Sequence, residues 1–148
     1  MKSKFFLIII AVLAVNACTI SPETSVAVDT KPIVMINATS DATTDPHMIT
    51  MGMHLAQKSL KNDIPVMMFF NVHGVKIFKP GMDSLTFHNE NLQALLKDII
   101  ANGGKVMACP HCMMVENIDK SMLPEGVVVA EEEVLVNSIK ENPMVFNY

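Results

Sequence analysis

The chain has 148 residues, with 15 acidic and 11 basic side chains and a formal net charge of −4. This weakly acidic balance provides no basic surface, so we expect no nucleic-acid partner. Residues 31–148 are enough for one compact domain but too few for two.

The first 17 residues are predicted to be a secretory signal peptide. Two lysines form a charged start, and the apolar stretch that follows, residues 5–15, is too short to span a bilayer. Small residues then lead to the sequence VNAC, which resembles a bacterial lipobox. Its cysteine, Cys18, would be the lipid-bearing first residue of the mature protein. Asn16 is unusual inside such a box, so ordinary cleavage after Ala17 remains open.

Residues 18–30 are polar and are predicted to form a tether between this lipid anchor and the domain. Export places the protein in the periplasm or cell envelope, where disulfides persist. If Cys18 carries lipid, the odd number of cysteines is explained, because only Cys109 and Cys112 remain to form a dithiol or a disulfide. The membrane is then a partner only through the N-terminal lipid.

Five short apolar runs predict strands. They are nearly continuous rather than alternating, which is typical of strands that are buried on both faces of a parallel sheet. In chain order they cover residues 32–36, 65–70, 105–108, 127–130 and 144–148.

Helical patterns lie between these strands. The first covers residues 45–62, where Asp45 can cap the helix and Pro46 suits its first position. Its apolar residues form two stripes, which predicts that the helix is covered on more than its sheet-facing side. The second pattern, residues 89–104, has one clear apolar face, and the third, residues 131–143, begins with acidic residues that suit a helix start.

The alternation of strands and helices predicts an α/β fold, a three-layer α/β/α sandwich with a mainly parallel five-stranded sheet. The connection over residues 71–88 is too long for a simple turn, and we expect it to be functional or to form a partner interface. Ligands of such sheets bind beyond the carboxyl ends of the strands. The loops predicted at that edge carry Asn37, Asp45, His47, Asn71, His73, Cys109 and Cys112. Which of these side chains meet depends on the strand order, which remains open.

The tetrapeptide Cys-Pro-His-Cys at residues 109–112 is the strongest candidate site. Cys109 would end the third strand, and Cys112 would lie in the first turn of the following helix. The exposed amides of a helix start stabilise a thiolate, so they lower the pKa of a cysteine and make it reactive. We expect His111 to tune the two thiols.

Two other kinds of protein contain similar motifs. Strongly oxidising members of the thioredoxin-like oxidoreductases share Cys-Pro-His-Cys, and soft-metal carriers use Met-x-Cys-x-x-Cys, which residues 107–112 match. In both folds most of the domain follows the motif, whereas little chain follows Cys112 here. Neither complete fold is therefore expected. A thiol-disulfide oxidoreductase or a Cu(I)-binding module on another fold remains open, as does a scaffolding oligomer with unreactive thiols.

From about residue 31 onward the chain resembles the DsrE/DsrF-like (YchN-like) family. The resemblance rests on segments in a fixed order, which are DPHMITMGMHLAQKSL, IPVMMFFNVHGVKIF, LQALLKDIIANGGKVMACPHCM and LPEGVVVA, followed by an acidic helix and a closing apolar strand. The resemblance implies the same three-layer sandwich, assembly into trimers or hexamers, and sulfur relay.

In that family a cysteine in the loop after the third strand can carry sulfane sulfur as a persulfide, so the resemblance implies a sulfurtransferase or sulfur carrier. Cys109 and Cys112 occupy this region, and which of them carries the sulfur stays open. The neighbouring cysteine would attack the persulfide, release sulfide and leave a disulfide that needs an external reductant. The implied partners are sulfur donor and acceptor proteins or small thiols, and no cofactor is expected.

Two features depart from the family pattern. Well-described relay members are cytoplasmic, and several have one functional cysteine, whereas this chain is predicted to be exported and has a cysteine pair. The physiological substrate therefore stays open.

Overall fold

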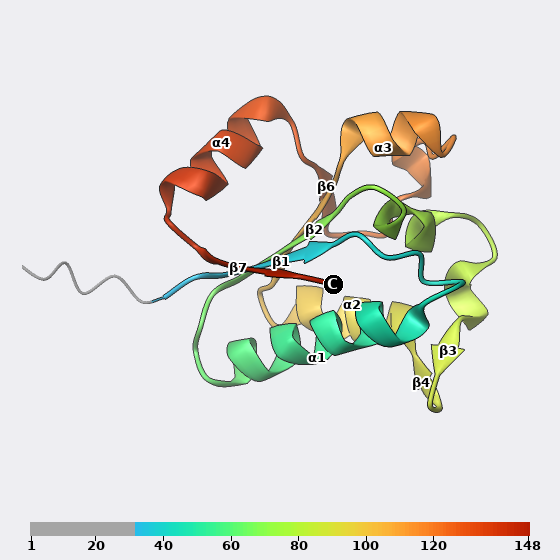
Figure 1. Ribbon diagram of the computed structural model, residues 1–148, viewed down its shortest axis with the longest axis horizontal. Coiled ribbons are helices and arrows are strands. Elements are labelled where there is room, and N and C mark those ends of the chain that lie inside the picture. Colours follow the sequence, from blue (N-terminus) through green and yellow to red (C-terminus); the bar gives the residue numbers. More distant parts are fainter. Residues whose placement is uncertain (1–31) are drawn as a thin grey trace, which may run out of the picture.

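The computed structural model describes residues 32–148 (Figure 1). The predicted signal peptide, tether and lipidation site at Cys18 lie outside the described residues. The predicted order of strands and helices is confirmed. The main strands are β1 (Val34–Ala38), β2 (Val66–Phe70), β5 (Lys105–Ala108), β6 (Val127–Val129) and β7 (Met144–Asn147).

These five strands form one parallel sheet in the order β6-β5-β2-β1-β7. β2 and β5, which lead into the two loops of greatest interest, are therefore neighbours. β1 begins two residues later than predicted, at Val34, and its amide binds the carbonyl oxygen of Pro65 at 2.9 Å.

Helices cover both faces of the sheet, so the predicted three-layer α/β/α sandwich is confirmed. α1 (Pro46–Lys61) and α2 (Leu92–Ala101) lie on one face, and α3 (Pro110–Val115) and α4 (Glu132–Lys140) lie on the other (Figure 1). The larger part of the core lies under α1 and α2, and the smaller part lies under α4. Among residues 32–148, no helix combines the length and the apolar character needed to cross a membrane.

Local interactions explain where the helices begin and end. Asp45 caps α1 as predicted, since its side chain accepts the amide of Met48 at 3.3 Å, and Pro46 occupies the first turn. Asn91 caps α2 through the amide of Ala94 at 2.8 Å.

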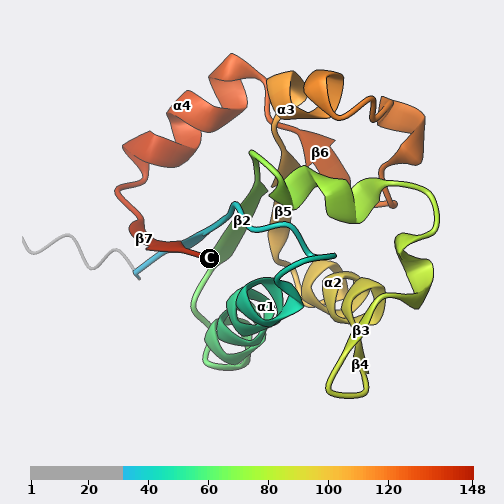
Figure 2. The same ribbon diagram turned by 45° about the vertical axis from the view of Figure 1, so that its right-hand side comes forward.

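The long connection between β2 and α2 is built from short elements. It contains the 3-10 helices η1 (Gly74–Phe78) and η2 (Met82–Ser84), followed by a small hairpin of β3 (Thr86–Phe87) and β4 (Glu90–Asn91). The hairpin projects beside α2 (Figure 2).

The hairpin is held against α1. His54 of α1 pairs with Glu90 at 2.8 Å, and the ring of His47 stacks on Phe87 with 5.2 Å between centroids. The hairpin end of the connection is therefore anchored on α1.

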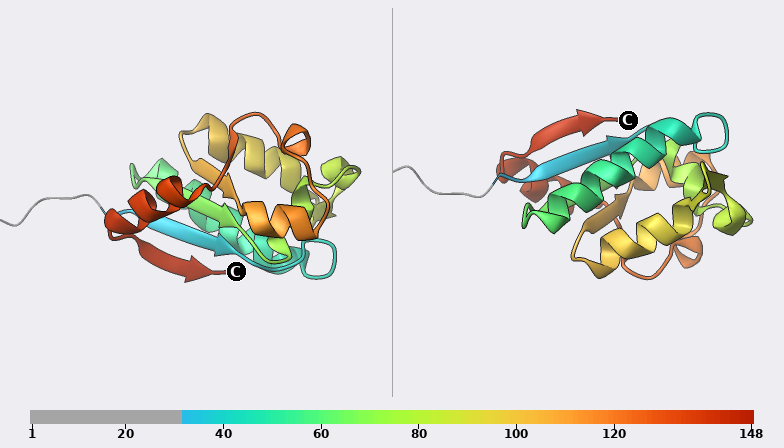
Figure 3. Two further views of the ribbon diagram at one scale, coloured as in Figure 1. Left: turned by 90° about the horizontal axis from the view of Figure 1, so that it is seen from above. Right: turned by 90° about the horizontal axis from the view of Figure 1, so that it is seen from below.

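The edge strand β7 differs from the sequence prediction. Its apolar run predicts burial on both faces, yet Met144, Val145 and Phe146 are 39–53 % exposed. Figure 3 shows β7 at the rim of the sheet beside β1. The apolar run is explained by parallel pairing with β1, but no described element covers the outer side of the strand.

Gly74, at the start of η1, fixes how the loop after β2 crosses the end of β1. A Cβ atom at this position would overlap the carbonyl oxygen of Ala38, which already accepts the amide of Asn71 at 3.0 Å. We expect Gly74→Ala to lower the free energy of unfolding by about 3 kcal/mol, because overpacking against backbone is not easily relieved.

The matched control is Gly81→Ala, where φ is +90° but nothing lies within 4 Å of the added Cβ. We expect this substitution to cost only about 1 kcal/mol, the strain of a left-handed residue. Urea unfolding monitored by circular dichroism measures both values. Equal costs for the two substitutions would show that the close approach at Gly74 does not constrain the fold.

Candidate functional site

The candidate site lies where β5 passes into α3. Cys109 follows β5 directly, and its amide binds the carbonyl oxygen of Phe70 at the end of β2 at 2.9 Å. Pro110 begins the helix, and the Sγ of Cys109 accepts the amide of Cys112 at 3.4 Å. Cys109 is thus the N-cap of α3, and both cysteines are free thiols that are partly buried.

The loop after β2 contacts the second cysteine. The amide of Val72 donates a hydrogen bond to the Sγ of Cys112 at 3.1 Å. Val72 has φ of +49° although it is β-branched, and its side chain is 54 % exposed. A β-branched residue rarely adopts this conformation, which costs about 1–3 kcal/mol and persists only where surrounding contacts enforce it. The strained backbone aims an amide at the sulfur while the apolar side chain remains in solvent.

The acid-base behaviour of Cys112 differs from the sequence prediction. Burial, reinforced by a hydrogen bond with the Cys109 side chain, raises the pKa of the Cys112 thiol above its usual value. The Val72 amide acts in the opposite direction but is outweighed. The prediction of a lowered pKa at the helix start is therefore wrong for Cys112, because desolvation outweighs the amide contact. Cys112 is protonated at neutral pH.

A charge network fastens the loop after β2 to α3. Glu116, one turn beyond Cys112, accepts the Lys79 ammonium at 2.7 Å and lies 3.7 Å from that of Lys76. The Nδ1 atom of His73 lies 3.3 Å from the same carboxylate. The Glu116 side chain is only 14 % exposed, whereas the His73 side chain is 60 % exposed.

Lys76 extends the network to the loop after β1. Its ammonium binds the carboxylate of Asp41 at 2.8 Å, and Thr43 donates to the same carboxylate from its amide and its hydroxyl. Although partial burial raises the pKa of Asp41, the hydrogen bonds from Lys76 and Thr43 lower it more, to about 2. Asp41 therefore remains ionised throughout the neutral range and holds η1 in place.

A row of amides runs along the carboxyl edge of the sheet. Asn71 donates to Asn37 at 2.7 Å, and Asn37 donates to Asn147 at 3.0 Å. The Oδ1 atom of Asn71 is buried without a hydrogen-bond partner among the described residues. This row ties β7, β1 and the loop after β2 together, directly before the strained residue Val72.

These contacts show which of the predicted edge residues come together. The side chains or neighbouring backbone of Asn37, Asn71, His73, Cys109 and Cys112 form one connected cluster. Asp45 and His47 lie outside it, since the first is the cap of α1 and the second stacks on Phe87.

Sequence reasoning missed the groups that enclose the cysteines. Val72, Lys76, Lys79 and Glu116 belong to the cluster, and none of them is part of a recognisable motif. Their one sequence indication is the length of the connection that carries three of them. His111 is exposed, and its ring makes no hydrogen bond to another residue within 32–148.

A sequence model of the DsrE/DsrF-like family matches residues 33–148. The chain belongs to the DsrE/DsrF-like family. No curated protein matches it in sequence.

Solved structures show the same DsrE/DsrF-like fold. A protein of unknown function from Methanobacterium thermoautotrophicum is 13 % identical with a TM-score of 0.59, and the match covers 80 % of this chain and 99 % of that one. The ychN protein from E. coli is 17 % identical with a TM-score of 0.55 and the same coverage. A conserved protein of unknown function from Bacteroides thetaiotaomicron is 16 % identical with a TM-score of 0.54, covering 78 % of this chain and 93 % of its own.

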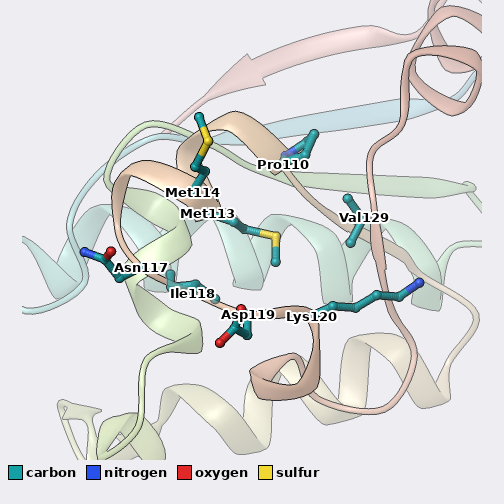
Figure 4. Close-up of a pocket in the computed structure, with 8 residues that line it drawn as sticks. All are labelled: Pro110, Met113, Met114, Asn117, Ile118, Asp119, Lys120 and Val129. Atoms are coloured by element: carbon teal, nitrogen blue, oxygen red, sulfur yellow. The ribbon is translucent and has the colours of Figure 1, made fainter.

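An open pocket of about 480 Å³ lies beside α3 in this DsrE/DsrF-like domain (Figure 4). Met113 points into it, and Pro110 of the cysteine motif and Lys120 border it. Neither cysteine lines the pocket. The Cys112 sulfur instead contacts the loop after β2.

The donor set of the DsrE/DsrF-like site is a pair of thiols. Within residues 32–148, no group of three or more His, Cys, Asp or Glu side chains is placed to hold a metal ion. What the site does offer is two neighbouring thiols with one amide donor directed at each sulfur. Such a pair can exchange sulfur atoms or cycle between dithiol and disulfide.

The raised pKa of Cys112 is directly measurable. We expect the thiolate absorbance of a Cys18→Ser, Cys109→Ala variant, which retains only Cys112, to appear above the pH range of an ordinary cysteine, because burial remains the main cause of the shift. Since the neighbouring thiol is a secondary cause, the midpoint in this variant should lie below that of Cys112 in the intact pair. A midpoint at or below the ordinary cysteine value would contradict the assignment.

Proposed function

We propose that this chain is a sulfur-handling protein of the cell envelope that carries sulfane sulfur as a persulfide on Cys109 and releases it through a Cys109–Cys112 disulfide. Family membership supports sulfur relay as the general function. One observation carries the finer proposal, namely two free thiols at the β5–α3 junction that are joined by a hydrogen bond from the Cys112 amide to the Cys109 sulfur at 3.4 Å.

The two cysteines are suited to different roles. Cys112 is partly buried, receives the Val72 amide and has a raised pKa, so it rests as a thiol. A protonated thiol is a poor first nucleophile but a suitable resolving group once a persulfide lies beside it. Cys109, whose sulfur accepts the Cys112 amide, is therefore assigned as the acceptor of sulfur.

The first step transfers one sulfur atom. The Cys109 thiolate attacks the outer sulfur of a donor persulfide RSSH, and the electron pair of the broken S–S bond leaves with the donor thiol. Overall, Cys109–SH and RSSH give Cys109–SSH and RSH.

The second step is an internal redox reaction. Cys112 attacks the inner sulfur of Cys109–SSH, a disulfide forms, and hydrosulfide and one proton are released. The sulfane sulfur gains two electrons and the two thiols lose them, so a dithiol reductant must restore the pair. This requirement makes donor thiols and reducing proteins the expected partners.

The N-terminal residues supply the location in this proposal. A signal peptide over residues 1–17, lipidation of Cys18 and a tether to residue 30 would hold the domain at the envelope membrane. Disulfides persist in that compartment, which suits a cycle that passes through one.

Variants of the two cysteines test the sulfur chemistry. In a Cys18→Ser background, we expect Cys112→Ser to gain the mass of one sulfur atom after exposure to glutathione persulfide, because the acceptor remains while the resolving thiol is absent. The unmodified pair should instead end as a disulfide without added sulfur, and the double variant Cys109→Ser, Cys112→Ser should not react. Intact-mass spectrometry distinguishes these products.

The same experiment separates the proposal from the second candidate, a thiol-disulfide oxidoreductase. The pair of free thiols at the start of α3 is the observation that favours this alternative. If Cys112→Ser remains unmodified by the persulfide while the intact pair reduces a disulfide substrate with turnover, the sulfur-carrier proposal is wrong. Matched circular dichroism spectra of the variants control for misfolding.

We also propose that the domain self-associates through the surface around β7, as the family resemblance implies. Three residues of β7 and two on the outer side of α1, Met48 and Met51, are apolar and 37–53 % exposed. The two elements are close, since Gly52 of α1 lies against the ring of Tyr148, the residue after β7. An uncovered apolar strand at a sheet edge is an aggregation liability unless a partner covers it, and a second copy supplies a matching apolar surface.

Charged substitutions in this surface test the assembly. We expect the double variant Met51→Glu, Val145→Glu to shift the mass in solution toward the monomer, because burying two carboxylates at an apolar interface is costly. Light scattering after size exclusion measures the mass. The control is Val128→Glu at the opposite edge of the sheet, where the side chain is 43 % exposed. Equal masses for both variants and the unmodified chain would contradict the assignment of this interface.

A further inference from the structure

We propose that His73, oriented by Glu116, is the general base that removes the proton from Cys112 when Cys112 resolves a persulfide. This inference rests on the proposed function, because it assigns the proton transfer of its second step. It also selects between the histidines near the site, since His111 lies within the cysteine motif and His73 lies far from it in sequence.

The geometry that places His73 is a pair of adjacent contacts. Val72 and His73 are consecutive in the loop after β2, and Cys112 and Glu116 are one helical turn apart along α3. The Val72 amide binds the Cys112 sulfur at 3.1 Å, and the His73 ring binds the Glu116 carboxylate at 3.3 Å. The loop therefore runs along this side of α3, and it brings His73 to the side of the helix at which the Cys112 sulfur receives the Val72 amide. In the proposed step the Cys112 proton passes to the imidazole through one intervening water molecule.

The contact with Glu116 fixes the state of the imidazole. A carboxylate only accepts hydrogen bonds, so the Nδ1 atom of His73 carries the proton in this contact. In the neutral ring the Nε2 atom is then left as the acceptor. The hydrogen bond from Lys79, with smaller contributions from His73 and Lys76, holds the pKa of Glu116 below its usual range. Glu116 thus stays ionised and acts as a positioning residue.

The resolving step requires such a base. Cys112 rests as a thiol because burial raises its pKa, and the nucleophile in sulfur exchange is the thiolate. A positioned base supplies the thiolate at the moment of attack, which typically accelerates a reaction about 100-fold or more.

The proton and electrons of the step are fully accounted for. The Nε2 atom of His73 takes the Cys112 proton, the sulfur electron pair forms the bond to Cys109, and the electron pair of the persulfide bond leaves with hydrosulfide. The imidazolium then releases its proton to solvent, which the ring can reach because it is 60 % exposed.

The charges around His73 come from three elements. Glu116 of α3 is its direct partner, Lys76 and Lys79 of the η1 region share that carboxylate, and Asp41 of the loop after β1 binds Lys76. The two carboxylates and the two ammonium groups balance, so the network around the ring has no net charge. Glu116 still orients the ring through its contact with the Nδ1 atom. This arrangement differs from that of His111, whose ring makes no hydrogen bond within residues 32–148.

Single-turnover kinetics test the proposal in the exported chain with Cys18→Ser. Reduced protein is mixed with glutathione persulfide, and the release of sulfide is followed between pH 6 and pH 10. Sulfide reports the second step alone, because transfer of sulfur from this donor releases a thiol instead. We expect His73→Gln to slow sulfide release about 100-fold near pH 7. Near pH 10 the difference should shrink to about threefold, because Cys112 then ionises without a base. Glu116→Gln should fall between these two rates at pH 7.

Two further measurements separate a base from a structural role. Added imidazole should restore sulfide release in His73→Ala, because the exposed position admits a small base, whereas it should not affect the matched control His111→Ala. A pH-independent loss in His73→Gln without rescue by imidazole, or an equal loss in His111→Gln, would overturn the proposal. Transfer of sulfur to Cys109 is measured separately, as the mass of added sulfur. It is compared between the single variant Cys112→Ser and the double variant that also carries His73→Gln. Failure of Cys112→Ser to load would refute the proposed function itself, whereas normal loading with unchanged release in His73→Gln refutes only this inference.

Discussion

The hydrogen bond from the Val72 amide to the Cys112 sulfur is the interaction on which the site depends. It joins the loop after β2 to α3, and it requires a β-branched residue in a left-handed conformation. Such strain persists only where other contacts enforce it. Here the preceding residue is fixed by Asn37, and the following residue is fixed by Glu116. The amide is therefore held at the sulfur by the fold itself, which gives the proposed sulfur transfer a preorganised contact.

The parallel sheet explains why these distant segments meet. β2 and β5 are neighbours, so the loop after β2 and the cysteines after β5 emerge side by side at one sheet edge. Gly74 lets the loop pass close to the end of β1, and the Asp41–Lys76–Glu116 chain of ion pairs then holds η1 against α3. The same burial that organises the site raises the pKa of Cys112, which is why the proposed cycle uses this thiol to resolve the persulfide and assigns it a base.

The sequence predicts much of this fold and less of this site. Apolar runs and the Asp45–Pro46 start locate the strands and helices within a few residues, because burial and capping are local properties of the chain. The position of the cysteine pair at the end of β5 is also predicted, because Cys-Pro-His-Cys is a contiguous motif that local sequence reveals. The partners of those cysteines depend on strand order and on one strained backbone angle, which no periodicity encodes. Glu116 and Val72 were therefore missed, and the lowered pKa predicted for Cys112 is wrong because it took account of the helix start and not of burial. The exposure of β7 was missed because an edge strand and a central strand have the same apolar run.

The central claim is that one cysteine carries sulfane sulfur and the other converts it to sulfide. The stoichiometry of a single turnover measures this most directly, with sulfide released and protein thiols lost counted on the same sample in the absence of reductant. The account predicts one sulfide released for every two thiols lost, since each persulfide that is resolved leaves one Cys109–Cys112 disulfide. Loss of both thiols without release of sulfide, or release of sulfide with both thiols retained, would contradict it.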